Sequence, residues 1–333
     1  MTDGRALVVG AGSIGLRHRS VLEGAGLVTG LVSRRQQSGL QDVHADLAAG
    51  VRDGSPTHVV IATETSTHLE VLDALAETGF TGTVVVEKPL THRPVPLTGY
   101  PFRAVAVGYQ LRMHPAVEVA RELLSGDEIL AVDAYVGQHL ADWRPGRAVG
   151  DSASARVEDG GGVLRDLSHE LDLVTWLAGA WRRVCAVGGR SGSLGPDVAT
   201  DDRWAILLEL ESGSIATVHL NALDHVGQRR LSVAGARTTV AVDLVAGTLR
   251  VGPGGGDLRH FGEDRDEVLA RFHRAVMDDP GAEAGDGSRA VGDRICSLEQ
   301  GMAVVELIDA IERSVREGGW IVRGSSAAQE RVA

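Results

Sequence analysis

Short apolar runs alternate with helical patterns over the first third of the chain. Runs at 6–9, 57–62, 83–86 and 105–107 have the length and the β-branching of buried strands. Between the runs, apolar positions recur at helical spacing. Strands that read as continuous apolar runs and alternate with helices are typical of a parallel sheet covered on both faces. The pattern therefore predicts an α/β domain over residues 1–112.

The pattern changes after residue 112. Helical patterns cover 116–124, 163–178, 264–278 and 292–316. Strand-like runs cover 129–136, 204–211, 214–221, 230–235, 238–243 and 247–251. Closely spaced strands with short turns are typical of antiparallel pairing. Residues 113–333 are therefore predicted to form a second α/β domain with a mostly antiparallel sheet.

Composition excludes several classes of protein. With 43% hydrophobic and 23% charged residues, the chain resembles an ordinary globular protein. No run of about 18 apolar residues predicts a membrane span, and no secretory leader precedes the first strand. The net charge of -12 argues against a nucleic-acid partner. Two cysteines make neither a disulfide framework nor a zinc cluster, so we expect a cytoplasmic protein without a metal.

A glycine-rich turn joins the first strand to the first helix. The turn reads Gly10-Ala11-Gly12-Ser13-Ile14-Gly15 and fits G-x-G-x-x-G. In this context the three glycines permit a tight turn, close approach of a pyrophosphate, and close packing of helix on strand. The helix N-terminus adds N–H groups for phosphates. The turn therefore predicts dinucleotide binding by a Rossmann domain, and the alternative is a tight turn without a ligand.

A second predicted strand ends at Leu31-Val32, and the residues after it bear on the choice of dinucleotide. An NAD site usually has an acidic residue there, which binds the ribose 2′-hydroxyl. This chain has Ser33, Arg34 and Arg35 instead, and the next acidic residue is Asp42. Arginine pairs with a 2′-phosphate. The sequence therefore favours NADP(H), with NAD(H) as the alternative.

The only lysine among the 33 basic residues is Lys88. It follows Glu87 at the end of the 83–86 run, and ligands of open α/β sheets bind beyond the carboxyl ends of the strands. A lysine there can donate a hydrogen bond to a substrate oxygen. We therefore expect Lys88 to act in catalysis, and Glu87 and Lys88 to contact the cofactor. The alternative is a loop lysine paired with Glu87.

A second cluster lies in the predicted helix over 163–178. Asp166, His169 and Asp172 are three residues apart, which places them roughly on one helix face. A histidine flanked by carboxylates is suited to acid/base work near neutral pH. The alternative is that these residues form local salt bridges at the start of a helix, which would give the same spacing.

The order of several motifs resembles a known family. The motifs are GAGSIG, ATETSTHLEVL, EKPL, GYQLRMHP and GGGVLRDLSHELDL. Together they are similar to the glucose–fructose oxidoreductase, inositol dehydrogenase and rhizopine catabolism (Gfo/Idh/MocA) family over nearly the whole chain. The resemblance implies a Rossmann domain, followed by an α/β domain whose open, mostly antiparallel sheet often serves in oligomerisation. It also implies hydride transfer between NAD(P) and a hydroxyl or carbonyl carbon of a sugar or cyclitol.

The resemblance assigns roles to particular residues. It implies that Lys88 is the catalytic lysine, His169 the catalytic histidine and Asp166 its upstream aspartate. It implies that Thr63, Thr65 and His68 bind the cofactor, and that Tyr109, Arg112 and His114 line the substrate cleft. We also expect Trp143 to contact the substrate. The spacing of Asp166 and His169 is three rather than the four of many members. The proline-rich stretch after Lys88 also predicts that one covering helix is missing.

Three functional hypotheses follow. The leading one is an oxidoreductase in which Lys88 polarises a carbohydrate oxygen and His169 exchanges its proton, in a homodimer or homotetramer. The second is a non-catalytic NAD(P)-sensing protein, which need not keep the lysine and the histidine. The third is a reductase of a non-sugar ring, for which Trp143 and Trp176 are the nearest apolar candidates.

Overall fold

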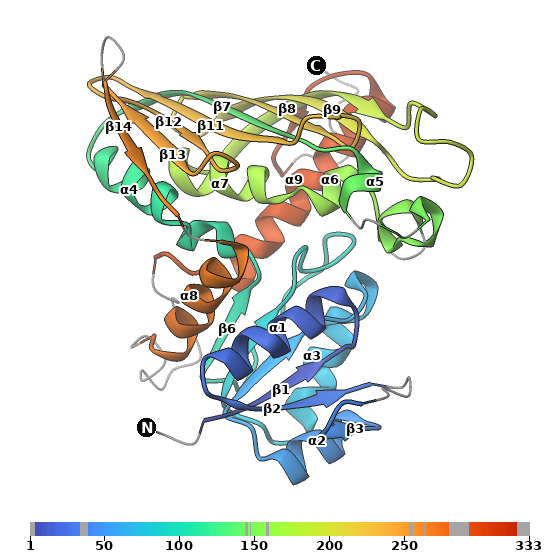
Figure 1. Ribbon diagram of the computed structural model, residues 1–333. Coiled ribbons are helices and arrows are strands. Elements are labelled where there is room, and N and C mark those ends of the chain that lie inside the picture. The colour runs from blue at the N-terminus through green and yellow to red at the C-terminus, as the bar shows by residue number, and fades with distance from the viewer. Residues whose placement is uncertain are drawn as a thin grey trace. The chain divides into compact units, whose positions relative to one another are not determined.

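The computed structural model divides the chain into two compact units (Figure 1). The first unit comprises residues 1–113 and 263–305, and the second comprises 114–262 and 306–333. The residues described are 4–33, 39–143, 146, 148–157, 160–252, 256–262, 264–279 and 293–324. Among these residues, none of the helices combines the length and apolarity that a membrane crossing requires.

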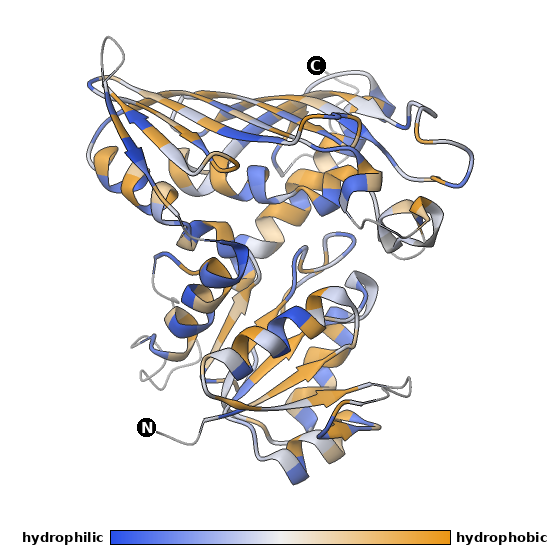
Figure 2. Cartoon of the chain, in the orientation of Figure 1, coloured by the Kyte–Doolittle hydropathy of each residue, from blue (hydrophilic) through white to orange (hydrophobic). Residues whose placement is uncertain are grey.

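The first unit is built on a six-stranded parallel sheet in the order β3-β2-β1-β4-β5-β6. Its strands are β1 (Arg5–Val9), β2 (Val28–Val32), β3 (Val43–His44), β4 (His58–Ile61), β5 (Thr83–Val86) and β6 (Ala104–Val107). Strands β4 and β5 are buried on both faces and are hydrophobic after their first residues, His58 and Thr83 (Figure 2). The parallel α/β sheet predicted from the apolar runs is confirmed.

Helices cover both faces of this sheet. Helices α2 (Leu47–Gly54) and α3 (His68–Glu77) pack on one face. Helix α1 (Ser13–Gly24) packs on the other face beside α8 (Arg265–Met277), drawn in orange in Figure 1. The apolar side of α8 joins the core formed by α1 and by alternate residues of β1, β4, β5 and β6.

Helix α8 corrects the expected assignment of residues 113–333 to one domain, because residues 263–305 belong to the first unit. The reason lies between β5 and β6, where residues 87–103 are all described and contain no helix. The predicted gap in the covering layer is therefore real. Phe272 and Val276 of α8 are buried in the core of the first unit, so a later segment covers that face.

The second unit contains a nine-stranded sheet in the order β14-β13-β12-β11-β7-β10-β9-β8-β15. Its strands are β7 (Ile129–Gly137), β8 (Trp181–Gly189), β9 (Arg203–Leu210), β10 (Ile215–Asn221), β11 (Gln228–Gly235), β12 (Thr239–Asp243), β13 (Thr248–Val251), β14 (Asp257–His260) and β15 (Ile321–Val322). Neighbouring strands are antiparallel except for β10 and β7. The mostly antiparallel sheet is confirmed, while β8, β14 and β15 had not been predicted.

Helices cover one face of this sheet. They are α4 (Pro115–Leu123), α5 (Leu140–Trp143), α6 (Val163–Asp166), α7 (His169–Ala178) and the later part of α9 (Leu298–Glu317). Side chains at alternate positions of the strands are buried under α4 and α7. The intervening positions lie on the opposite face, and Figure 2 shows the resulting alternation of colours.

The single helix predicted over 163–178 is wrong, because α6 ends at Asp166 and α7 begins at His169. Two features hold α6 as a separate turn. The Asp201 carboxylate accepts a hydrogen bond from the Leu164 N–H at 2.8 Å. Gly162 has φ of 122°, and a Cβ there would lie 2.1 Å from Asp201 Oδ1. Asp166 and His169 therefore lie on either side of a break rather than on one continuous helix face.

Candidate active site

The glycine-rich turn lies at the carboxyl end of β1. Gly10 has φ of +112°, and a Cβ there would lie 2.4 Å from the Ala62 carbonyl oxygen. A Cβ on Gly15 would lie 2.0 Å from the Gly10 carbonyl oxygen, so the turn and α1 can approach this closely only as glycines. Gly12 has open space around its Cβ position and caps α1 without a side chain. The turn thus fits a dinucleotide pyrophosphate, which Gly12 and the N–H groups of Ser13 and Ile14 would approach.

The segment after β4 lies beside this turn. Thr63 follows Ala62 directly, and its hydroxyl accepts a hydrogen bond from the Thr67 hydroxyl at 2.9 Å. Thr65 begins the short 3₁₀ turn η1 (Thr65–Thr67), and both threonines are half-buried. The next residue, His68, is buried at the start of α3.

His68 links the segment after β4 to the segment after β5. Its ring nitrogens lie 3.3 Å from the Thr63 carbonyl oxygen and 3.2 Å from that of Pro89. Burial lowers the pKa of His68 below its ordinary value, although the charge of Glu87 and the nearby carbonyl groups act in the opposite direction. Burial thus disfavours the charged imidazole. Because a neutral ring carries one N–H, it can donate to a carbonyl group of only one of the two segments at a time.

Glu87 and Lys88 follow β5 directly. Glu87 is buried, and its Oε2 accepts a hydrogen bond from the Lys88 backbone N–H at 3.1 Å. A Cβ on Gly108, after β6, would lie 3.0 Å from Glu87 Oε1, so this glycine leaves room for the carboxylate. Lys88 is half-buried at the sheet edge that also carries the glycine-rich turn and the Thr63 segment.

Tyr109 and Arg112 follow β6 and are fully buried. Nη1 of Arg112 donates a hydrogen bond to Gln300 Oε1 at 2.7 Å, which ties the end of the sheet to the start of α9. Their substrate roles stay predictions, and the contact with Gln300 shows that Arg112 also has a structural one. Ser33 follows β2 and donates its N–H to the His44 carbonyl, whereas Arg34 and Arg35 lie outside the described residues.

The remaining predicted residues belong to the second unit. His114 caps α4, where its Nδ1 accepts a hydrogen bond from the Ala116 N–H at 3.2 Å. Trp143 ends α5 and donates its indole N–H to the Gln138 carbonyl at 3.0 Å. Asp166 is half-buried and His169 is buried. These residues and those at the edge of the first sheet form two groups, one in each unit.

His169 stands on an anchored helix. The next residue, Glu170, is buried, and its two oxygens accept hydrogen bonds from Arg229 on β11 at 2.7 and 2.9 Å. Two parallel bonds of this kind fix the direction of both side chains. The pair therefore holds the first turn of α7 against the sheet and fixes the place of the His169 backbone.

Sequence reasoning missed three histidines packed behind Glu87. They are His18 on α1, His58 on β4 and His273 on α8, and all three are buried. One signal was available, since His58 is a polar residue within an otherwise apolar strand. Nothing in the sequence, however, indicated that α8 would bring His273 to the same place.

Comparisons with known proteins agree with this arrangement. Residues 5–96 match a family described as "Oxidoreductase family, NAD-binding Rossmann fold" (GFO_IDH_MocA), and residues 117–241 match the "GFO/IDH/MocA C-terminal domain". No match is found among curated protein sequences.

Several solved structures share the fold over nearly their whole length. One is a levoglucosan dehydrogenase in complex with NADH and levoglucosan, with 18% identity, a TM-score of 0.78, and coverage of 96% of this chain and 98% of that one. GenD2 from gentamicin A biosynthesis, in complex with NAD, has 21% identity and a TM-score of 0.74 over 98% and 97% of the chains. UDP-N-acetylglucosamine 3-dehydrogenase GnnA from Acidithiobacillus ferrooxidans has 19% identity and a TM-score of 0.73 over 95% and 99%.

Proposed function

Because the chain belongs to the Gfo/Idh/MocA family of oxidoreductases with an NAD-binding Rossmann domain, we propose that it acts on the secondary alcohol or ketone of a sugar, sugar derivative or cyclitol. The observation that carries this proposal is the position of Lys88. It is the chain's single lysine, at the sheet edge that carries the glycine-rich turn. The cofactor, when bound, would accept or supply a hydride.

Three residues of this chain would supply the other catalytic roles. Lys88 donates a hydrogen bond to the substrate oxygen and stabilises the charge that develops on it. His169 takes the hydroxyl proton in oxidation and returns it in reduction. Asp166 orients the imidazole and favours its protonated form. The structural neighbours act on or bind levoglucosan and UDP-N-acetylglucosamine, by their names, and this supports a carbohydrate substrate.

A panel of sugars tests this function. The purified protein is incubated with NAD⁺ or NADP⁺ and with anhydrosugars, inositols, amino sugars and nucleotide sugars, and formation of reduced nicotinamide is followed by absorbance. Turnover of any member supports the enzyme. Tight cofactor binding without turnover of any member, in either direction, would favour the alternative of a non-catalytic NAD(P)-sensing protein.

We also propose that NADP(H) is the preferred cofactor, with NAD(H) as the alternative. The support is the absence of an acidic residue directly after Ser33 and the presence of Arg34 and Arg35. The NADH and NAD complexes of two structural neighbours support the alternative.

A titration followed by the fluorescence of the five tryptophans decides between the cofactors. We expect NADPH to bind at least about tenfold more tightly than NADH, because a charge-assisted pair to the 2′-phosphate is worth about 1.5–3 kcal/mol. The double variant Arg34→Ala, Arg35→Ala should lose this preference and keep its affinity for NADH. Equal or reversed preference in the unaltered protein would overturn the proposal.

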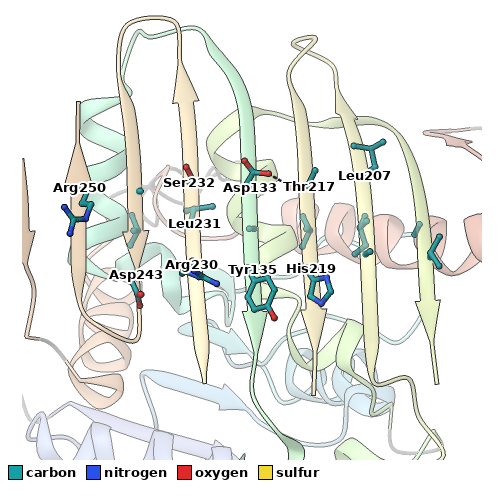
Figure 3. Close-up of a pocket in the computed structure, with 18 of the residues that line it drawn as sticks. Asp133, Tyr135, Leu207, Thr217, His219, Arg230, Leu231, Ser232, Asp243 and Arg250 are labelled. Carbon is teal, nitrogen blue, oxygen red and sulfur yellow. Dashed lines mark hydrogen bonds between the residues drawn. The ribbon is translucent and has the colours of Figure 1, made fainter. Parts of the chain in front are cut away.

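The open face of the nine-stranded sheet supports a homo-oligomer. Figure 3 shows side chains of β7, β9, β10, β11, β12 and β13 on this face. The rings of Tyr135 and His219 are stacked with their centroids 4.9 Å apart, and Arg230 lies near the Tyr135 ring. Val187 and Leu207 on the same face are exposed. Exposed apolar side chains among polar ones mark association surfaces. We therefore propose a homodimer or homotetramer formed through this sheet.

The double variant Val187→Glu, Leu207→Glu should convert the oligomer to a monomer, because it would place charges in the interface. Light scattering after size-exclusion chromatography measures the mass. The matched control is Val226→Glu with Val245→Glu, at exposed positions that do not line this face. A monomer of the unaltered protein, or an oligomer that survives the first pair, would contradict the proposal.

A cytoplasmic location remains part of the proposal. Cys185 and Cys296 are both free cysteines, and such thiols persist in a reducing compartment.

A further inference from the structure

A continuous chain of hydrogen bonds runs through the buried side of the first unit. Glu87 Oε1 lies 2.8 Å from His18 Nε2, and His18 Nδ1 lies 2.8 Å from His273 Nε2. His273 Nδ1 lies 3.0 Å from His58 Nε2, and His58 Nδ1 lies 2.7 Å from Thr83 Oγ1. Both nitrogens of all three rings are thus engaged. The chain joins α1, β4, β5 and α8.

Water does not reach these rings. His18, His58 and His273 are each at most 1% exposed. His273 meets its two neighbours edge-on, at interplanar angles of 77° and 88°, so each ring is held in the direction of the next nitrogen. Buried polar groups with all their partners rigidify a core, whereas partly satisfied ones are costly. We refer to the three imidazole rings and Glu87 together as the histidine chain.

Counting hydrogens limits the histidine chain to two arrangements of donors and acceptors. An ionised carboxylate only accepts, so His18 Nε2 carries a hydrogen and donates it to Glu87. In neutral rings each Nδ1 then accepts, so His273 donates to His18 and His58 donates to His273. Thr83 Oγ1 then donates to His58 rather than to the Thr57 carbonyl oxygen, which lies 3.4 Å away. If His18 is protonated, the other two rings reverse, His58 donates to Thr83, and the Thr83 hydroxyl donates to Thr57. In either case His273 and His58 each have a single tautomer.

Both arrangements place a donor, His18 Nε2, opposite Glu87, and the charge at Glu87 agrees with this. Burial by itself would raise the pKa of Glu87, but the hydrogen bond and charge of His18, with the charge and backbone N–H of Lys88, lower it below its ordinary value. The charge of Glu87 also acts on His68 of α3, whose pKa burial lowers. Burial lowers the pKa of His58 to about 3 and holds that of His273 well below its ordinary value. Glu87 is therefore a carboxylate facing a donor at each oxygen.

We propose that His18, His273 and His58 are positioning residues for Lys88. The histidine chain holds Glu87 with Oε1 toward α1, which leaves Oε2 to accept the Lys88 N–H and fixes the lysine backbone at the end of β5. Helix α8, although distant in the sequence, thus helps to position Lys88 through His273. The inference rests on the proposed catalytic role of Lys88. The hydrogen bonds of the histidine chain and of the Lys88 amide can nevertheless be tested without measuring turnover.

The single lysine makes the test selective. Protein labelled with ¹⁵N-lysine has one backbone lysine amide, and that amide is the donor to Glu87. We expect its hydrogen to exchange slowly in the unaltered protein. His273→Leu should raise the exchange rate roughly tenfold and shift the signal, because it leaves His18 Nδ1 without its hydrogen-bond partner and frees Glu87 to reorient.

Two further variants separate positioning from simple destabilisation. His273→Gln keeps one donor and one acceptor, so it should restore slow exchange. Val268→Ala removes buried apolar volume from the same helix, more than one turn away from His273, so it should leave the Lys88 amide unchanged. Equal effects of His273→Leu and Val268→Ala, or no effect of His273→Leu in a folded protein, would overturn the proposal.

Labelling with ¹⁵N-histidine provides a readout that needs no variant. We expect His58 and His273 each to show a single tautomer with slowly exchanging ring hydrogens. Mixed tautomers, or fast exchange at the Lys88 amide of the unaltered protein, would overturn the proposal even if His273→Leu did not fold. Because neither measurement uses a substrate, an inactive protein with an ordered histidine chain would refute only the proposed function.

Discussion

Replacing Lys88 by alanine is expected to lower turnover by roughly 10²–10⁴-fold, the range in which a positioned proton donor or acceptor contributes. The expected dissociation constant of the reduced cofactor changes little, because the glycine-rich turn and the segment after β4 remain in place. The measurements are steady-state kinetics with the substrate found by the sugar panel, and a fluorescence titration with NADPH and NADH.

Two variants complete this experiment. Lys88→Arg keeps the positive charge but replaces a compact ammonium with a larger, permanently charged guanidinium, so it should also be impaired. Arg93→Ala removes an exposed cation from the same segment and should remain active. Normal turnover of Lys88→Ala would refute the catalytic role. Loss of cofactor binding together with turnover would make Lys88 a cofactor-binding residue instead.

Mild acid is expected to destabilise the protein steeply. The pKa of His58 falls from 6.5 to about 3 on folding, mainly through burial, with the charges of His18 and Arg103 acting in the same direction. Below pH 6.5 the unfolded chain therefore binds a proton that the folded chain does not, and stability falls as the pH falls. The loss is about 1.4 kcal/mol per pH unit for each such imidazole. The pKa of His273 is also held well below its ordinary value, so His273 makes stability fall in the same direction.

Urea unfolding at pH 7.5 and pH 5.0 measures this loss. From pH 6.5 to 5.0 His58 alone should remove about 2 kcal/mol from the free energy of unfolding, and His273 should add to this loss. His273→Gln should therefore have a weaker pH dependence, whereas the exposed His260→Gln should behave like the unaltered protein. An unfolding midpoint that is the same at both pH values would contradict the burial of neutral histidines.

The first sheet could be predicted from local sequence patterns. Strands such as β4 and β5 are buried on both faces, so their apolar residues are contiguous and easy to recognise. The turn at Gly10 was also recognisable, because only glycine tolerates its φ and its close neighbours. Lys88 was found by its rarity and by its position after a strand.

Features that depend on distant contacts were not predictable in this way. The break between α6 and α7 depends on Asp201, which lies 35 residues after Asp166. Strand β8 alternates between buried and exposed positions with glycines at its end, and its pairing with β9 determines its structure. The histidine chain requires residues 18, 58, 87 and 273 together, and no local pattern joins them.

The place of α8 has a consequence for the order in which the protein can be made. Residues 1–113 leave a ribosome before α8 is synthesised, so the face of the sheet beside α1 stays uncovered while about 150 further residues are translated. During the same interval His18 and His58 lack His273, the residue with which both form hydrogen bonds. The dinucleotide-binding unit is thus discontinuous in the gene, and it matures only after most of the second unit has been synthesised.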